Sequence, residues 1–186
     1  MLATVICYTI LAAFFVLERA LRRGSEARAM DATPFDRGTT RAIGLAFLAC
    51  VLVALIAPLV ALGQFGNPWI AWVGVAVMTS GIWLRAWANR TLGAFYTRTL
   101  KTTQRQAVIS NGPYRVLRHP GYAGVLLMWL GAGLALRNWI ALVLMVGFLG
   151  WAYRRRINAE EEMLLTNIGK EYREYSRTWR IIPFIY

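Results

Sequence analysis

A stretch of 21 residues without a charged side chain constrains the fold of this chain more than any other feature. The stretch runs from Ala42 to Leu62, and a helix needs roughly 20 apolar residues to cross the hydrocarbon core of a bilayer. The backbone of such a segment finds no water to hydrogen-bond inside a lipid core, so it is expected to be helical. The sequence therefore predicts an integral membrane protein.

Four further apolar segments repeat this pattern along the chain. They are Leu2–Leu17, Trp69–Ala88, Tyr122–Leu136 and Trp139–Tyr153. The last two have 15 residues each and are joined by only two residues, which predicts a tight helical hairpin. A helix of that length covers about 22 Å, less than the roughly 30 Å of a bilayer core. We expect an all-α integral membrane bundle of about five transmembrane helices, with a cytosolic C-terminal helical cofactor site.

The positive charges indicate how the bundle is oriented. The net charge is +12, and 19 of the 21 Lys and Arg residues lie in three segments, Arg19–Arg41, Arg90–Arg118 and Arg154 onward. Alternating spans place all three segments on one side, which the positive-inside rule identifies as the cytosol. Only Arg85 and Arg137 lie elsewhere. Because the basic residues flank apolar runs instead of forming a solvated basic face, no nucleic-acid partner is expected.

The chain reads as a single domain with two regions. Residues 1–91 form the N-terminal transmembrane helices, and residues 92–186 form a catalytic region of connector, hairpin and C-terminal helices. The first apolar run lacks a basic leader and a cleavage site, so it is interpreted as a retained span. Cys7 and Cys50 each lie inside an apolar run without the spacing of metal ligands, so no metal site is expected.

Polar residues that could carry chemistry gather where the hairpin begins. His119 is the only histidine; Pro120 follows it, where a proline favours the start of a helix, and Tyr122 shares its helical face. Upstream, the turn signature Asn111–Tyr114 presents a second tyrosine. This cluster predicts a site at the cytosolic mouth of the hairpin.

Arg156 and Glu160 lie four residues apart and therefore share one helix face just beyond the last apolar run. The pair is typical of an exposed helix salt bridge of small energy, or of simple interfacial anchoring. It is equally compatible with a pocket in which the carboxylate holds an ammonium group and the guanidinium holds a carboxylate. The spacing alone leaves these alternatives open.

Several motifs recur in an order that resembles a known family. Gly112–Tyr122, the hairpin and Glu160-Glu161 are followed by Gly169, Tyr172, Tyr175 and Pro183. Over about residues 92–186 the chain resembles the isoprenylcysteine carboxyl methyltransferases, including their short bacterial and archaeal members. Phospholipid N-methyltransferases share the same RHPxY box followed by a Glu-Glu pair. The resemblance implies S-adenosyl-L-methionine bound on the cytosolic side and a lipophilic, isoprenoid-like acceptor that enters from the bilayer.

The resemblance also implies roles for individual residues. Arg156 would be the catalytic residue that binds the carboxylate of a prenylcysteine-like or other lipophilic acceptor. Cofactor-binding residues would be Gln106, Ala107, Val108, Ile109, Tyr114, His119, Pro120, Gly121, Tyr122 and Glu160. Two positions depart from the family pattern, since Gln106 stands where histidine is common and Gly121 stands where serine is frequent.

The chemistry of the residues agrees with these roles. Tyrosine rings attract a sulfonium cation, and methyl transfer to a carboxylate needs positioning but no general base. An amine acceptor, as in a lipid methyltransferase, would need a base such as Glu161 or His119. Two other functions stay as alternatives: an NADPH-dependent sterol-type membrane reductase, and a transporter or scaffold. The last is disfavoured because ion relays need several intramembrane charges.

Overall fold

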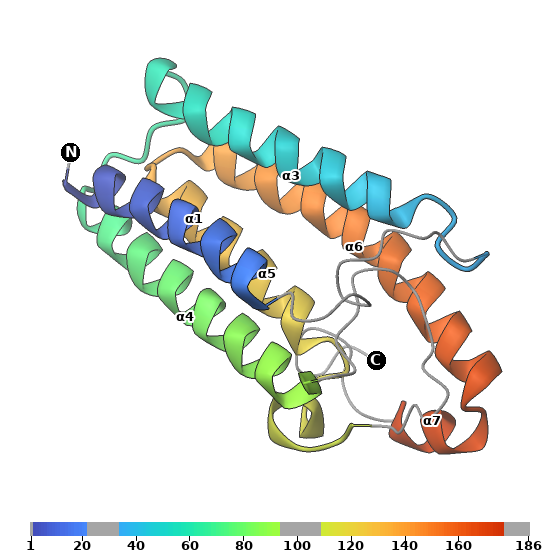
Figure 1. Cartoon of the computed structure of the whole chain (residues 1–186). Coiled ribbons are helices and arrows are strands. Elements are labelled where there is room, and N and C mark those ends of the chain that lie inside the picture. Colours follow the sequence, from blue (N-terminus) through green and yellow to red (C-terminus); the bar gives the residue numbers. More distant parts are fainter. Residues whose placement is uncertain (1, 22–33, 94–108, 177–186) are drawn as a thin grey trace.

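The computed structural model describes residues 2–21, 34–93 and 109–176, and this part of the chain consists of helices joined by short connections (Figure 1). Its only extended pairing is an isolated bridge between Gln64 and Asn138. The elements are α1 (Leu2–Leu21), α3 (Thr39–Ile56), η1 (Ala57–Leu59), α4 (Trp69–Leu92), η3 (Gly112–Arg115), α5 (Pro120–Ala135), α6 (Trp139–Asn167) and α7 (Lys170–Tyr175).

Three helical segments are long and apolar enough to cross a membrane, which confirms a helical membrane fold. They are Leu2–Arg19, Thr39–Leu59 and Trp69–Leu92, while α5 is apolar but shorter. The second segment differs in one detail from the expected continuous span. Its α-helix ends at Ile56 and gives way to the 3₁₀ turn η1, which contains Pro58. Proline lacks an N–H donor and crowds the preceding turn, so the final residues of the apolar run leave the α-helix.

The most extensive helix contact joins α4 to the antiparallel α5, and glycines make it possible. A Cβ at Gly131 would lie 2.5 Å from the backbone N of Met78, and one at Gly124 would lie 2.7 Å from the carbonyl of Gly81. Small residues let helix backbones approach this closely in membranes. Gly131 thus faces α4, whereas Gly133 meets α6, at Leu142.

The α5–α6 turn anchors the connection between α3 and α4, and we call this end of the bundle the turn end. The Asn138 side chain donates from Nδ2 to the Leu62 carbonyl at 2.9 Å. Arg137 donates from Nη2 to the carbonyl of Phe65 at 2.7 Å. Arg137, one of the two arginines outside the three basic segments, therefore donates to loop carbonyls.

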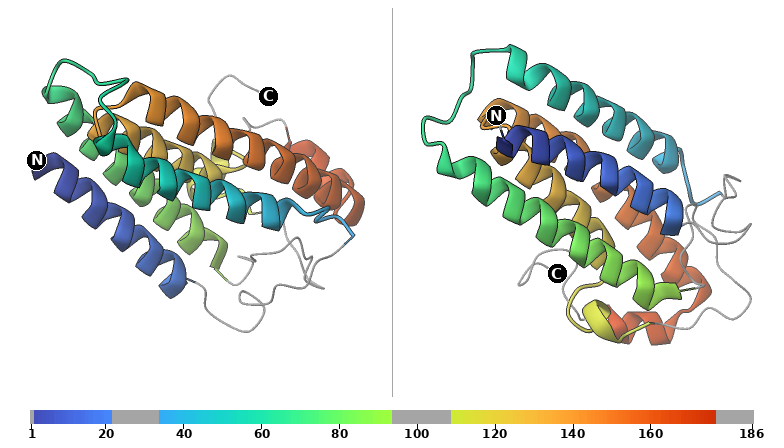
Figure 2. Two further views of the ribbon diagram at one scale, coloured as in Figure 1. Left: turned by 90° about the horizontal axis from the view of Figure 1, so that it is seen from above. Right: turned by 60° about the vertical axis from the view of Figure 1, so that its left-hand side comes forward.

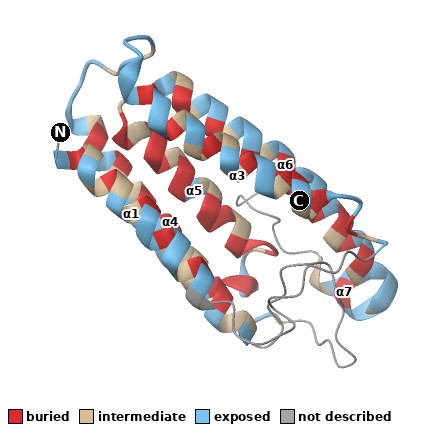
Figure 3. Cartoon of the chain, turned by 45° about the horizontal axis from the view of Figure 1, so that its top comes forward, coloured by how far each residue is buried: buried red, intermediate tan, exposed pale blue. Residues whose placement is uncertain are grey.

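The opposite end, which we call the site end, gathers segments that are distant in sequence. The start of α3, the end of α4, η3, the start of α5 and α7 all lie there (Figures 1 and 2). Buried faces point into the bundle, and α5 is mostly buried (Figure 3). The core between the helices includes Phe14, Met128, Trp129 and Met145, each at most 1% exposed. Helix α6 has 29 residues and continues past α3 to α7, which carries its charged second half into the site end.

Candidate functional site

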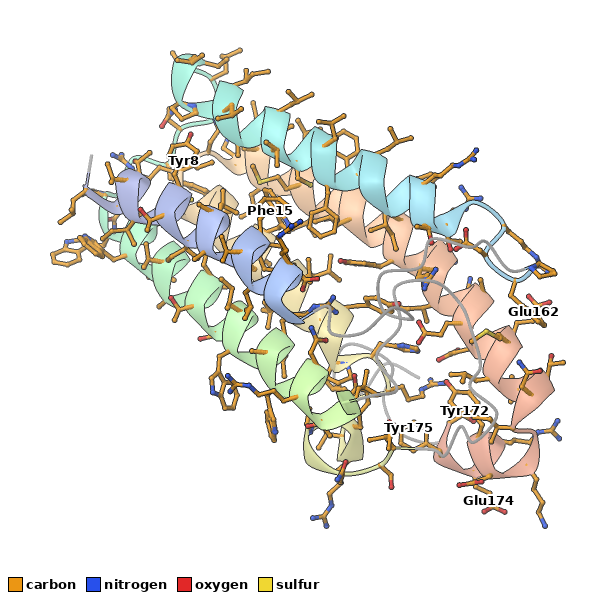
Figure 4. The ribbon with its side chains drawn as sticks, in the orientation of Figure 1. Tyr8, Phe15, Glu162, Tyr172, Glu174 and Tyr175 are labelled. Carbon is orange, nitrogen blue, oxygen red and sulfur yellow. The ribbon has the colours of Figure 1, made fainter. Side chains whose placement is uncertain are left out.

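The turn η3 presents one of the two expected tyrosines. Gly112 has a φ of +54°, a conformation that glycine adopts without steric cost, and Pro113 follows it. Tyr114 is buried, and its carbonyl accepts a 2.8 Å hydrogen bond from the hydroxyl of Tyr175 on α7. Figure 4 shows Tyr175 beside Tyr172 at this end of the molecule, far from Tyr8. The C-terminal helix is therefore fastened to the turn.

The start of α5 carries a row of stacked rings. The helix begins at Pro120, with His119 as its N-cap. His119 stacks on Tyr122 at 5.7 Å between centroids, which confirms that they share a face, and Tyr122 stacks on Tyr153 of α6 at 4.7 Å. The row fixes the orientation of Tyr122 between the two helices.

Tyr122 also contacts both Arg156 and Glu160 of α6. Its hydroxyl donates to Glu160 Oε2 at 2.7 Å and accepts from Arg156 Nε at 3.4 Å. Arg156 is only 3% exposed, so it does not form an exposed helix salt bridge. The side chains of residues 156 and 160 meet at one phenol inside the bundle.

A contact from the N-terminal half completes the surroundings of Arg156. Its Nη1 donates to Asp36 Oδ1 at 2.9 Å, and lies 3.2 Å from Thr39 Oγ1 and 3.3 Å from Thr40 Oγ1. Sequence reasoning missed these residues, because 116 or more positions separate them from Arg156. The only local signal was an aspartate at the start of a helix, which is ordinary in proteins.

Glu161 serves a different set of partners from Glu160. Its Oε1 accepts from Arg118 Nη1 at 2.9 Å and lies 3.1 Å from His119 Nε2. Arg118, His119 and Glu161 are all buried. The RHPxY box and the Glu-Glu pair, which are 38 to 42 residues apart, therefore contact each other side chain to side chain.

A second buried ion pair supports the start of α5. Glu18 of α1 accepts from Arg85 Nε at 2.8 Å and from its Nη2 at 3.3 Å. A Cβ at Gly121 would lie 2.8 Å from Arg85 Nη1. A serine at position 121 would therefore require the end of the Arg85 side chain to shift. The sequence singled out Arg85 as an intramembrane charge but gave no indication that Glu18 was its partner.

The remaining expected residues divide into two groups. Ile109 is half-buried, just before η3. Gln106, Ala107, Val108 and Pro183 lie outside the described residues.

Six buried side-chain atoms in the described part of the chain lack hydrogen-bond partners, and three of them are Arg118 Nε, Arg137 Nε and Trp129 Nε1. Both amide atoms of Asn89 are unpaired, and so is the hydroxyl of Tyr172. Asn89 is 5% exposed and Tyr172 is 4% exposed. Buried polar groups are almost always satisfied. These side chains, from α4 and α7, are therefore suited to a polar ligand with several hydrogen-bonding groups.

Burial raises the pKa of the phenols of Tyr114 and Tyr172, and the neighbouring carboxylates raise both further. The carboxylates concerned are Glu160 for Tyr114, and Glu161 and Glu160 for Tyr172. Both hydroxyls therefore stay protonated at neutral pH and can donate hydrogen bonds. The site contains four described carboxylates and three described arginines: Glu18, Asp36, Glu160, Glu161, Arg85, Arg118 and Arg156. Its carboxylates therefore outnumber its arginines by one.

Comparison with known proteins now identifies the family. The sequence model of the phospholipid methyltransferase family matches residues 69–171, more than half of the chain. This chain belongs to that family. The match includes α4, η3, α5 and α6, and so most of the site, but it ends before most of α7 and leaves out the N-terminal residues Asp36, Thr39 and Thr40.

Named relatives confirm the resemblance to isoprenylcysteine methyltransferases. The protein-S-isoprenylcysteine O-methyltransferase of Dictyostelium discoideum is 33% identical over 122 residues, which are 62% of this chain and 50% of the relative. A probable protein-S-isoprenylcysteine O-methyltransferase of Oryza sativa subsp. indica is 31% identical over 119 residues, 62% of each chain. This chain thus spans half to three-fifths of the length of these relatives.

A solved structure shares the fold. It is that of the eukaryotic intramembrane Ras methyltransferase ICMT, an isoprenylcysteine carboxyl methyltransferase, with a TM-score of 0.61 and 22% identity. The similarity covers 92% of this chain and 60% of the other. The N-terminal helices, which the family sequence model does not reach, are therefore part of the shared architecture.

Proposed function

We propose that this protein is an S-adenosyl-L-methionine-dependent membrane methyltransferase that methylates the carboxylate of a prenylcysteine-like or other lipophilic acceptor. The observation that carries the proposal is the part-buried junction of Glu160, Tyr122 and Arg156, in which the hydroxyl of Tyr122 contacts both the carboxylate and the guanidinium. Membership of the phospholipid methyltransferase family and the named relatives support the same chemistry.

The charge of the site fits the methyl donor. S-adenosyl-L-methionine carries a sulfonium, an ammonium and a carboxylate, and so one net positive charge, while the described carboxylates of the site outnumber its described arginines by one. Electrostatic complementarity of this kind favours binding and orients the ligand. The unpaired Asn89 and Tyr172 side chains offer hydrogen bonds to its polar groups.

Each residue has a role that follows from its surroundings. Glu160 pairs the ammonium group of the cofactor, and the rings of Tyr114 and Tyr122 stand near the sulfonium, where aromatic faces attract cations. Backbone N–H groups around His119 at the start of α5 favour the cofactor carboxylate. Residues 106–109 and Pro120-Gly121 complete the pocket, and residues 92–186 act as the catalytic region. The cofactor supplies an electrophilic methyl group, and the protein supplies positioning in a water-poor site.

Arg156 binds the acceptor carboxylate. A guanidinium has five N–H donors, so it can hold Asp36 and an acceptor carboxylate at the same time. Transfer to a carboxylate oxygen releases no proton, so no base is required. The apolar acceptor reaches the site from the bilayer because the site end adjoins the lipid-facing helices.

The membrane position follows from the exposed tryptophans, which favour interfaces. Trp69 and Trp139 lie at the turn end, and Trp87 and Trp151 lie toward the site end; all four are 40% or more exposed. The helix from Trp69 to Trp87 is about 27 Å long, close to the thickness of a bilayer core. We place the site end in the cytosol, with α5 and α6 as the final pair of spans, in a cytoplasmic membrane.

A second acceptor class is favoured by one contact. His119 and Glu161 lie 3.1 Å apart, and such a pair could remove the proton that methylation of a lipid amine releases. The name of the family model, phospholipid methyltransferase, agrees with this acceptor.

The test uses the purified protein in detergent with S-adenosylhomocysteine as ligand. We expect the ligand to raise the unfolding temperature of the wild-type protein, and Glu160→Gln to weaken binding at least about tenfold, since a charge-assisted contact contributes roughly 1.5–3 kcal/mol. Glu162→Gln is the matched control, because Glu162 lies on the same helix, is 47% exposed in its side chain and pairs only with Arg37 among the contacts described. Its binding should stay unchanged.

Two outcomes would contradict the proposal. One is stabilisation by NADPH with none by S-adenosylhomocysteine, which would favour the reductase. The other is equal ligand binding by Glu160→Gln and wild type. A labelled methyl donor then separates the acceptors: prenylcysteine analogues accept label if the acceptor is a carboxylate, and amino-phospholipids accept it if the acceptor is an amine.

A further inference from the structure

The segment that leads into α3 contacts Arg156, the residue proposed to bind the acceptor carboxylate. Residues 36–40 lie outside the part matched by the family model, 69–171. Asp36 is nevertheless 4% exposed and Thr39 is 2% exposed, and both contact Arg156 on the site side of α6. The N-terminal half of the chain therefore contributes more than membrane spans.

One oxygen of Asp36 organises this segment. Oδ1 accepts from the hydroxyls of Thr39 at 2.9 Å and Thr40 at 2.8 Å, and from the Thr40 backbone N–H at 3.2 Å. The same oxygen accepts from Arg156 Nη1 at 2.9 Å. A carboxylate with this many donors is fixed in place and stays ionised.

The guanidinium of Arg156 thus forms hydrogen bonds with two different segments. Asp36 holds Nη1 and Tyr122 holds Nε, while Tyr122 donates its own proton to Glu160. Asp36 thus contacts Arg156, Arg156 contacts Tyr122, and Tyr122 contacts Glu160. The orientation of Arg156 therefore depends on α3 as much as on its own helix.

The charge of Asp36 affects how Arg156 interacts with Glu160. Arg156 and Glu160 lie one helical turn apart, where opposite charges attract. If Arg156 lost Asp36, its buried charge would turn toward Glu160, the carboxylate one turn along its own helix. Glu160 would then be neutralised by the protein itself and no longer available to an ammonium group.

We propose that Asp36 is a positioning residue of the site: it holds Arg156 away from Glu160 and so keeps Glu160 available for a cationic ligand. The proposal rests on the proposed function for the identity of that ligand. It adds that the start of α3, which no catalytic motif includes, controls the affinity for the methyl donor.

The test compares single and double variants of the full chain in detergent. Asp36→Asn should weaken binding of S-adenosylhomocysteine at least fivefold. The double variant Asp36→Asn with Arg156→Met removes the cation that would occupy Glu160. Binding should then return to within about twofold of wild type, while methyl transfer stays lost because Arg156 is missing. A residue that only stabilised the fold would not produce this separation of binding from turnover.

Arg37→Gln is the matched control. Arg37 follows Asp36 and also contacts α6, through Glu162 at 2.9 Å, but its side chain is 62% exposed. Its ligand binding should equal that of wild type. If Asp36→Asn does not fold, Thr40→Val, which removes one of the hydroxyls that hold Asp36, should weaken binding by a smaller factor.

The inference is overturned if folded Asp36→Asn binds the ligand as wild type does, or if the double variant binds no better than Asp36→Asn alone. Failure of wild type to bind S-adenosylhomocysteine would reject the proposed function instead. Unfolding measurements then still test whether Asp36 balances the buried charge of Arg156. Asp36→Asn should unfold at a lower temperature than Arg37→Gln, and adding Arg156→Met to Asp36→Asn should restore part of the lost unfolding temperature.

Discussion

Adjacent residues of this site belong to different networks. Glu160 contacts Tyr122, whereas Glu161 contacts Arg118 and His119. On a helix, successive side chains differ in direction by about 100°, so Glu160 and Glu161 face different neighbours. Substitutions of the two carboxylates are therefore expected to have separate consequences, with Glu160 acting on cofactor binding and Glu161 on the position of the RHPxY box.

The ionisation of Asp36 predicts a pH dependence of stability. Burial alone would raise the pKa of this carboxyl group, but hydrogen bonds from Thr40 and Thr39 and the charge of Arg156 together lower it. A carboxyl group with a depressed native pKa stabilises the fold above its unfolded pKa, about 4. That stabilisation is lost as the pH falls through the native value.

We therefore expect wild type to be more stable than Asp36→Asn at pH 7, by up to about 3–5 kcal/mol, because the variant removes the counter-charge of a buried arginine. The difference should be constant from pH 7 to about 5 and shrink below pH 4. Unfolding temperatures in detergent across this range measure it. A difference that stayed constant down to pH 3 would contradict the assignment of the contribution to the ionised carboxylate.

At the scale of elements, the contact between α4 and α5 holds the site in register. Arg85 on α4 reaches Gly121 at the start of α5, and the glycine pairs 74/131 and 81/124 set the distance between the two helices. The site geometry at one end therefore depends on close packing along the whole length of α5.

Gly131→Ala tests this dependence. Its methyl group would overlap the backbone of α4 at Met78, and overpacking of this kind costs about 1–3 kcal/mol. Gly147→Ala is the control, since a Cβ at Gly147 meets nothing within 4 Å and alanine is the better helix former by up to about 1 kcal/mol. We expect a lower unfolding temperature and weaker ligand binding for Gly131→Ala only. Equal behaviour of the two variants would show that the helices can separate without cost.

At the scale of the whole molecule, the two ends have different compositions. The turn end has Arg137 as its basic side chain among the described residues, and loop carbonyls hold it. The site end carries the described parts of the three basic segments. This asymmetry is the physical basis for placing the site in the cytosol.

Cysteine labelling in intact cells measures the orientation. Asn67→Cys lies in the α3–α4 connection and Ser110→Cys lies just before η3, and both positions are exposed. A membrane-impermeant maleimide should label Asn67→Cys in intact cells and Ser110→Cys only after lysis. Cys7 and Cys50 are fully buried, so the background should be low. The reverse pattern would invert the proposed topology.

The sequence determined the apolar helices, the start of each to within three residues, and the contact face of His119 and Tyr122. These features depend on local properties, namely hydropathy, helical period and proline or glycine at helix ends, and each can be read from a short window. The motif resemblance added the family, and comparison with known proteins confirmed it.

Only the tertiary structure decided the partners of the charged residues. Arg156 is separated from Asp36 by 120 positions and Arg85 from Glu18 by 67. Which of several carboxylates reaches a given arginine depends on how the helices cross, and helix-crossing geometry is set by close contacts such as those of Gly131 and Gly124. Hydropathy predicts only that these charges lie near a membrane boundary. Helix packing decides that Asp36 contacts Arg156 and that Glu160 contacts Tyr122.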